Sequence, residues 1–138
     1  FLLDDQGYDL LAGLFKKTAI EEMIHVEKLA ERILFLKGEV EMKVGGKVEQ
    51  IKDPEKMLAK AAQMEQESAH EYNLWANEAS ANADSMTKQL FESLVADEER
   101  HYDQYDVETD NLKKFGDRYL ALQSIERSKN ISQGKTVD

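Results

Sequence analysis

The chain has 138 residues, of which 41% are apolar and 33% charged, with a net charge of −10 and no cysteine. This length allows one domain with a hydrophobic core, and we expect a single domain. The missing cysteines exclude disulfides and thiolate metal sites, and the acidic balance argues against a nucleic-acid partner. No apolar run is long enough to cross a bilayer, so we expect no membrane partner.

A single proline and abundant Ala, Leu, Glu and Lys are typical of long helices, so the expected fold class is all-α. The first long helix is expected at about residues 7–37. There, apolar residues recur at steps of four and three from Leu11 to Leu36. Two members of this stripe, Glu22 and His25, are polar.

The connection at residues 38–52 contains Gly45 and Gly46 and an alternating apolar pattern, so we expect it to be partly extended. It is unusually long for a helix bundle. When extended it reaches roughly 50 Å, about the length of a thirty-residue helix. The helices that it joins are therefore expected to run parallel.

A second long helix is expected from Asp53 and Pro54, an N-cap acceptor followed by proline at the first helical position, to about Ser80. A third is expected at about 84–115, where Gly116 supplies a natural stop. The gap between these two helices is short, so we expect them to be antiparallel neighbours.

Residues 117–127 are expected to form a short last helix, and residues 128–138 a flexible tail. Three long amphipathic helices leave one corner of an up-down bundle open. We expect a preceding helix to fill that corner, with residues 1–3 as its end and 4–7 as the turn. The helical domain would then span 1–127 and lack most of its first helix.

Two Glu-x-x-His pairs, Glu22 with His25 and Glu98 with His101, place carboxylate and imidazole on one face of each helix. Glu65 lies in phase on the apolar stripe of the intervening helix. A buried carboxylate costs on the order of several kcal/mol unless it is paired or binds a cation. Self-neutralisation of each Glu–His pair is the simpler alternative, but two pairs together with a third acid favour a metal site.

These residues are five of the six ligands found in di-iron and di-manganese bundles, where two helices supply Glu-x-x-His and two others one Glu each. Three carboxylates carry −3 against the +4 of two divalent cations, so a further carboxylate from the expected preceding helix would complete the neutralisation. Oxygen and imidazole ligands suit iron or manganese.

Residues 20–25 (IEEMIH) and 30–36 (AERILFL) resemble the second helix of bacterioferritins, and residues 97–101 (DEERH) fit that family equally well. The resemblance continues to Phe115 and includes the short helix near Tyr119. It implies a ferritin-like four-helix bundle with a long crossover between the second and third bundle helices, a short fifth helix and a first helix largely absent here.

By this resemblance Glu22 and Glu98 would bridge two iron ions, and Glu65 would be a terminal carboxylate. His25 and His101 would bind one iron each. The implied function is iron storage and detoxification, in which a ferroxidase oxidises Fe(II) with dioxygen or peroxide. The mineral would fill a homo-oligomeric shell of about twenty-four subunits, and we expect it in the cytoplasm.

Met23 matches the methionine with which bacterioferritins ligate haem on a dimer axis, so the resemblance implies haem b as a second cofactor. Packing in a helix–helix seam is the simpler alternative for a methionine. Lys17 and Glu21 depart from the His and Asp of some relatives on the cavity-facing side. Tyr72 and Tyr105 are expected to be core residues or hydrogen-bonding neighbours of the site rather than redox relays.

Two alternative functions remain open from the sequence. A rubrerythrin-like peroxide reductase shares the di-iron bundle, but its middle helix usually offers Glu-x-x-Glu, and Ser68 follows Glu65 here. The other alternative is a non-enzymatic shell or interaction protein in which the Glu–His pairs are structural.

Overall fold

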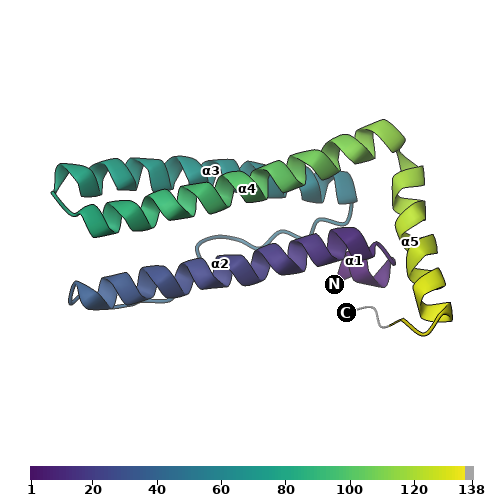
Figure 1. Cartoon of the computed structure of the whole chain (residues 1–138), viewed down its shortest axis with the longest axis horizontal. Coiled ribbons are helices and arrows are strands. Elements are labelled where there is room, and N and C mark those ends of the chain that lie inside the picture. The colour runs from purple at the N-terminus through teal and green to yellow at the C-terminus, as the bar shows by residue number, and fades with distance from the viewer. Residues whose placement is uncertain (136–138) are drawn as a thin grey trace.

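A computed structural model describes residues 1–135 (Figure 1), and all regular structure within them is helical. The all-α fold class is therefore confirmed. Positions 136–138, at the end of the expected tail, lie outside the described residues. The helices are α1 (Leu2–Asp5), α2 (Asp9–Phe35), α3 (Pro54–Ala81), α4 (Ser85–Phe115) and α5 (Asp117–Ser132).

Helices α2 and α3 run in the same direction, and α4 runs antiparallel to both (Figure 1). Residues 36–53 return along the length of the bundle without forming a strand. The length of this connection therefore predicted the direction of α3 correctly. Its apolar side chains, including Met42 and Val44, are exposed.

Side-chain caps begin the two later long helices where the sequence predicted. Asp53 accepts a hydrogen bond from the backbone N–H of Lys56 at 2.9 Å, and Asp84 accepts one from that of Thr87 at 3.0 Å. Such caps satisfy amide donors that have no partner within the helix. Asp84 also pairs with Arg32 of α2 at 2.7 Å, which ties the start of α4 to the end of α2.

Helix α5 turns away at Gly116, whose φ of +57° lies in the left-handed region that favours glycine. The helix then crosses the end of the bundle (Figure 1). It continues to Ser132, beyond the expected end at residue 127. Arg127 pairs with Asp4 of α1 at 3.1 Å and with Asp9 of α2 at 2.9 Å, and these contacts dock this part of α5 against α1 and the start of α2.

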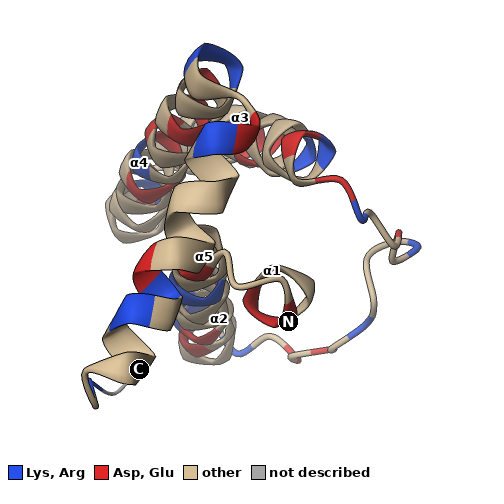
Figure 2. Ribbon diagram, turned by 90° about the vertical axis from the view of Figure 1, so that its right-hand side faces the viewer, with Lys and Arg blue, Asp and Glu red and all other residues tan. Residues whose placement is uncertain are grey.

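The hydrophobic core lies at the α5 end of the bundle, where α1, α2, α3 and α4 meet. Its buried side chains are Leu3, Leu11, Leu58, Tyr105 and Leu112. Lys and Arg residues are interspersed with Asp and Glu residues along the helices (Figure 2). Within residues 1–135 no helix is both long and apolar enough to cross a membrane.

Replacing Leu58 with alanine is expected to lower the free energy of unfolding by about 2–5 kcal/mol, because the side chain is fully buried and leaves a cavity. Equilibrium denaturation in urea measures this change. Leu74 on the same helix is 52% exposed, and Leu74→Ala should cost no more than about 0.5 kcal/mol. Equal effects of the two substitutions would contradict the assigned core.

Candidate metal centre

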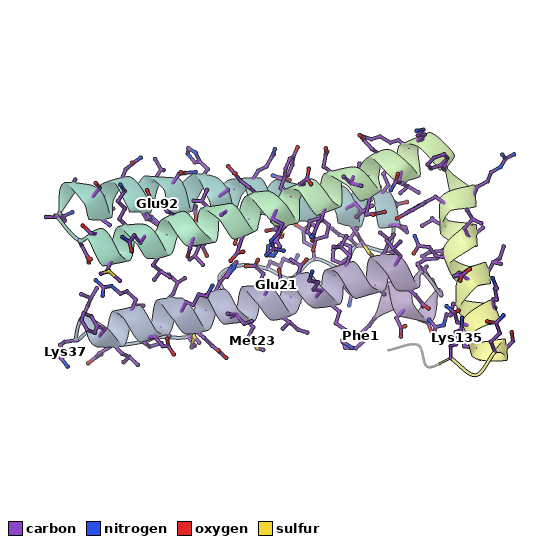
Figure 3. The ribbon with its side chains drawn as sticks, viewed as in Figure 1. Phe1, Glu21, Met23, Lys37, Glu92 and Lys135 are labelled. Carbon is purple, nitrogen blue, oxygen red and sulfur yellow. The ribbon has the colours of Figure 1, made fainter. Side chains whose placement is uncertain are left out.

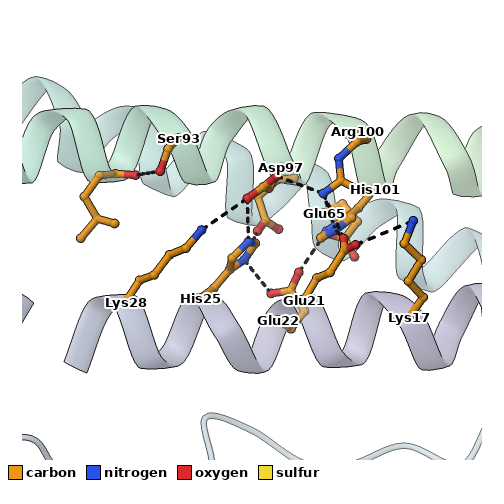
Figure 4. Close-up of polar contacts among 12 residues, drawn as sticks. Lys17, Glu21, Glu22, His25, Lys28, Glu65, Ser93, Asp97, Arg100 and His101 are labelled. Atoms are coloured by element: carbon orange, nitrogen blue, oxygen red, sulfur yellow. Dashed lines mark hydrogen bonds and ion pairs between the residues drawn. The ribbon is translucent and has the colours of Figure 1, made fainter. Parts of the chain in front are cut away.

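Three helices bring four potential metal ligands to one point midway along the bundle (Figure 4). One ligand atom from each residue lies within 4.8 Å of all the others. Helix α2 supplies one of these residues, α3 one and α4 two. They are Glu22, Glu65, Glu98 and His101.

His25 completes the set predicted from the sequence. Its Nδ1 lies 3.0 Å from Oε1 of Glu98 and 3.4 Å from Oε2 of Glu22. On the other side, Nδ1 of His101 lies 3.1 Å from Oε1 of Glu22 and 3.4 Å from Oε2 of Glu65. The structure therefore brings all five predicted residues together around one centre.

Most of this cluster is shielded from water. Glu98 is 1% exposed, His101 0%, His25 2% and Glu65 8%, whereas the side chain of Glu22 is 40% exposed. Buried carboxylates at this density repel one another unless protons or cations neutralise them.

Four buried atoms at the centre have no hydrogen-bond partner among the described residues. Each lies 3.0–3.4 Å from an imidazole nitrogen or a carboxylate oxygen of another ligand, but these contacts lack hydrogen-bond geometry. Buried polar atoms are nearly always paired, so such a group requires an explanation. A cation between them gives every atom a partner, and the donor set fits iron or manganese. The atoms are Oε1 of Glu22, Nδ1 of His25, Oε1 of Glu98 and Nδ1 of His101.

The Nε2 atom of each imidazole contacts a carboxylate of the opposite helix. Nε2 of His101 lies 2.5 Å from Oε2 of Glu21, and Nε2 of His25 lies 3.1 Å from Oδ2 of Asp97. A carboxylate at Nε2 keeps the proton on that nitrogen, which leaves the Nδ1 lone pair free to face a metal. This is the arrangement that a histidine ligand needs.

In the absence of a cation, Glu98 and His101 retain protons because of their burial and of the carboxylates around them. Burial raises the pKa of Glu98 to about 9, with Glu65 and Glu22 adding to the effect. Burial alone would lower the pKa of His101, but Glu22, Glu65 and Glu21 outweigh it and raise that pKa to about 10. A metal ion entering this site must therefore displace protons.

Comparison with known proteins agrees with this geometry. The Ferritin-like domain family matches residues 1–124. A bacterioferritin of Desulfovibrio desulfuricans is 33% identical over 121 residues, which cover 88% of this chain and 68% of that protein. The chain belongs to the bacterioferritin family. Further bacterioferritins match from Brucella melitensis, 33% identical over 88% of this chain and 76% of the relative, and from Streptomyces coelicolor, 27% identical over 96% and 80%.

Sequence reasoning missed the role of Glu21 and Asp97 in this member of the bacterioferritin family. Both stand directly before a ligand glutamate, so each Glu-x-x-His pair is in fact preceded by an acid. The acid lies four residues before the histidine of its own helix but contacts the histidine of the other helix. The repeated spacing was the available signal.

Two tyrosines lie near enough to the ligand carboxylates for those charges to affect their phenol groups. Tyr105 is buried and its ring centroid lies 5.1 Å from that of Phe15. Tyr72 stacks on Phe91 at 6.0 Å. Burial raises the pKa of each tyrosine to about 12, and for Tyr72 the charge of Glu98 adds to the effect. Both phenols are therefore neutral at physiological pH.

Met23 faces away from the metal centre and is 58% exposed, on the side of α2 opposite α3 and α4 (Figure 3). Among the described residues, Met23 therefore does not pack in a seam between helices. Lys17 lies on the other side of α2, where its Nζ is 3.8 Å from Oε1 of Glu21. Lys17, one of the two positions that depart from some bacterioferritins, thus contacts Glu21, the acid that contacts Nε2 of His101.

Proposed function

We propose that the protein stores iron by oxidising Fe(II) at a di-iron centre and depositing ferric mineral in a homo-oligomeric shell in the cytoplasm. The observation that carries this proposal is the set of four buried, unpaired ligand atoms that face one another between α2 and α4. Membership in the bacterioferritin family supports the storage role.

Each ligand has a distinct role in this proposal. Glu22 and Glu98 lie between the two histidines and would be shared by the two iron ions, and Glu65 would be a further carboxylate ligand from α3. His25 and His101 would each hold one iron ion through Nδ1. Two Fe(II) ions held here would give up one electron each and become Fe(III). With two protons, these electrons would reduce dioxygen to hydrogen peroxide, or hydrogen peroxide to water.

The surrounding residues prepare the site for this chemistry. Glu21 and Asp97 fix the orientation of the imidazole rings, so little reorganisation is needed when a metal binds. Protons held by Glu98 and His101 leave when Fe(II) enters.

Anaerobic addition of Fe(II) to metal-free protein, followed by dioxygen or peroxide, tests the proposal. Absorbance of Fe(III) should appear faster than in buffer alone, with two Fe(II) ions bound per chain before oxidation. Zn(II) added first should occupy the same ligands and suppress the oxidation. The particle, measured by light scattering, should be a large shell. Absent metal binding, or a stable monomer, would contradict storage.

We also propose that Met23 ligates haem b between two copies of the chain. A thioether is a suitable axial ligand, and Met23 is exposed beside other exposed apolar side chains of α2, including Ile20 and Ile24. Exposed apolar surface of this kind is typical of an interface between subunits.

Purified protein reconstituted with haem is expected to show a Soret band that is absent or strongly shifted in Met23→Leu. Met64 is also exposed, on α3, and Met64→Leu serves as the matched control with an unchanged spectrum. An unchanged Soret band in Met23→Leu would remove the haem proposal and leave the iron centre untouched.

The rubrerythrin-like alternative gains no support from the site. Helix α3 contributes one carboxylate, Glu65, to the ligand cluster, and Ser68 stands where a second acid would be required. The non-enzymatic alternative is separated by metal analysis, because purely structural Glu–His pairs would bind no iron, manganese or zinc.

A further inference from the structure

Arg100 of α4 lies over the outer side of the metal centre, between the two acids that hold the histidines (Figure 4). Its Nη2 donates one hydrogen bond to Oε2 of Glu21 and one to Oδ1 of Asp97, each at 3.0 Å. One guanidinium nitrogen therefore joins an acid of α2 to an acid of α4.

These contacts extend to both histidines through the acids. Oε2 of Glu21, which accepts from Arg100, is the same atom that contacts Nε2 of His101. Asp97 uses its two oxygens separately, with Oδ1 on Arg100 and Oδ2 on Nε2 of His25. Each imidazole is thus two hydrogen bonds away from Arg100, so a single cation is linked to both rings.

A cation is needed at this point because two carboxylates from facing helices approach the same place. Lys17 lies 3.8 Å from Glu21 and Lys28 lies 3.9 Å from Asp97, so each lysine approaches only one acid. Among residues 1–135, Arg100 is the cation that contacts both. The planar guanidinium suits such a bridge better than an ammonium group does.

We infer that Arg100 is a positioning residue that fixes both metal-site histidines at once by tying Glu21 to Asp97. The inference rests on the proposed metal centre for its purpose, but the bridge itself exists in the metal-free chain. Without Arg100 the two acids repel each other and turn towards solvent. Both rings then lose the partner that directs Nδ1 to the centre.

Proton NMR of the full metal-free chain tests the bridge without any metal. The wild type is expected to show two hydrogen-bonded Nε2–H signals, from His25 and His101, that exchange slowly with water. Arg100→Ala should lose both signals, whereas Lys17→Ala and Lys28→Ala should keep both. Retention of both signals in Arg100→Ala, or loss of only one, overturns the inference.

Titration with Co(II), without an oxidant, tests the consequence for metal binding. Loss of a residue that supports ligands typically weakens binding by about 10–100-fold, and Arg100→Ala should weaken both Co(II) sites by at least about tenfold. Arg100→Lys, which keeps the charge, should bind more tightly than Arg100→Ala and restore part of the visible Co(II) spectrum. Wild-type affinity in Arg100→Ala would overturn the inference.

The two experiments separate this inference from the proposed function. If the wild type binds no Co(II), the metal centre fails as a proposal, and the NMR comparison still decides whether Arg100 holds both rings. If the wild type binds two Co(II) ions and Arg100→Ala binds them equally well, the metal centre stands and the inference on Arg100 fails.

Discussion

Replacing Glu98 with glutamine is expected to lower the rate of Fe(II) oxidation by at least about 100-fold, since losses of supporting residues alone cost about 10–100-fold. Glu98 is 1% exposed, and its Oε1 is an unpaired atom that faces Nδ1 of His25 at 3.0 Å. Glutamine has nearly the same shape but carries no negative charge. The substitution therefore removes an anionic bridge from the centre with little change in volume.

Stopped-flow absorbance after mixing Fe(II)-loaded protein with dioxygen or peroxide measures this rate. Glu99 follows directly in α4 and is exposed, so Glu99→Gln removes one negative charge from the same turn without touching the ligands. That variant should stay within about twofold of the wild type, as expected of a solvated charge. Equal rates for the wild type and Glu98→Gln would contradict the assignment of Glu98 as a ligand.

Much of the fold followed from local sequence signals. Asp53 and Pro54 favour the start of a helix, and Gly116 favours the end of one, because of the capping side chain and the backbone conformations that these residues adopt. The start of α3 and the end of α4 could therefore be predicted from one or two residues each. The convergence of five ligands also followed from helical periodicity. Residues spaced three apart share a face, and a face that carries leucines must point to the core.

Contacts between helices were harder to predict. The pairing of Glu21 with His101 and of Asp97 with His25 depends on how α2 and α4 cross, and no period along a single helix contains that information. The Arg100 bridge has the same origin. The docking of α5 was missed for a related reason, because Arg127 contacts acids more than a hundred positions earlier in the chain.

The geometry links these missed contacts to the function proposed for the cluster. Negative charge gathered at one buried point is unstable by itself, so the protein needs either protons or metal ions there. The outer acids determine which nitrogen of each ring faces that point. The same few side chains therefore determine the stability of the protein, the number of protons it holds and its metal binding. A change in pH or in bound metal should accordingly change its stability.

Metal-free protein is expected to lose stability as the pH rises from 6 to 9. The pKa of Glu98 rises on folding from 4.5 to about 9, mainly through burial. That of His101 rises from 6.5 to about 10, because nearby carboxylates outweigh its burial. In this window the folded state holds more protons than the unfolded state, so the free energy of unfolding falls as pH increases. The lowered pKa values of Glu21 and Asp97 act only in acid.

Thermal unfolding of the metal-free chain should show a Tm at least about 5 °C lower at pH 9 than at pH 6. Saturation with Zn(II) should raise the Tm and remove most of this dependence, because bound cations replace the protons. Glu98→Gln should reduce the fall but keep the part that is due to His101. A metal-free Tm that stays constant or rises between these pH values would show that Glu98 and His101 do not hold these extra protons. The unpaired ligand atoms would then lack the electrostatic strain from which we infer a cation site.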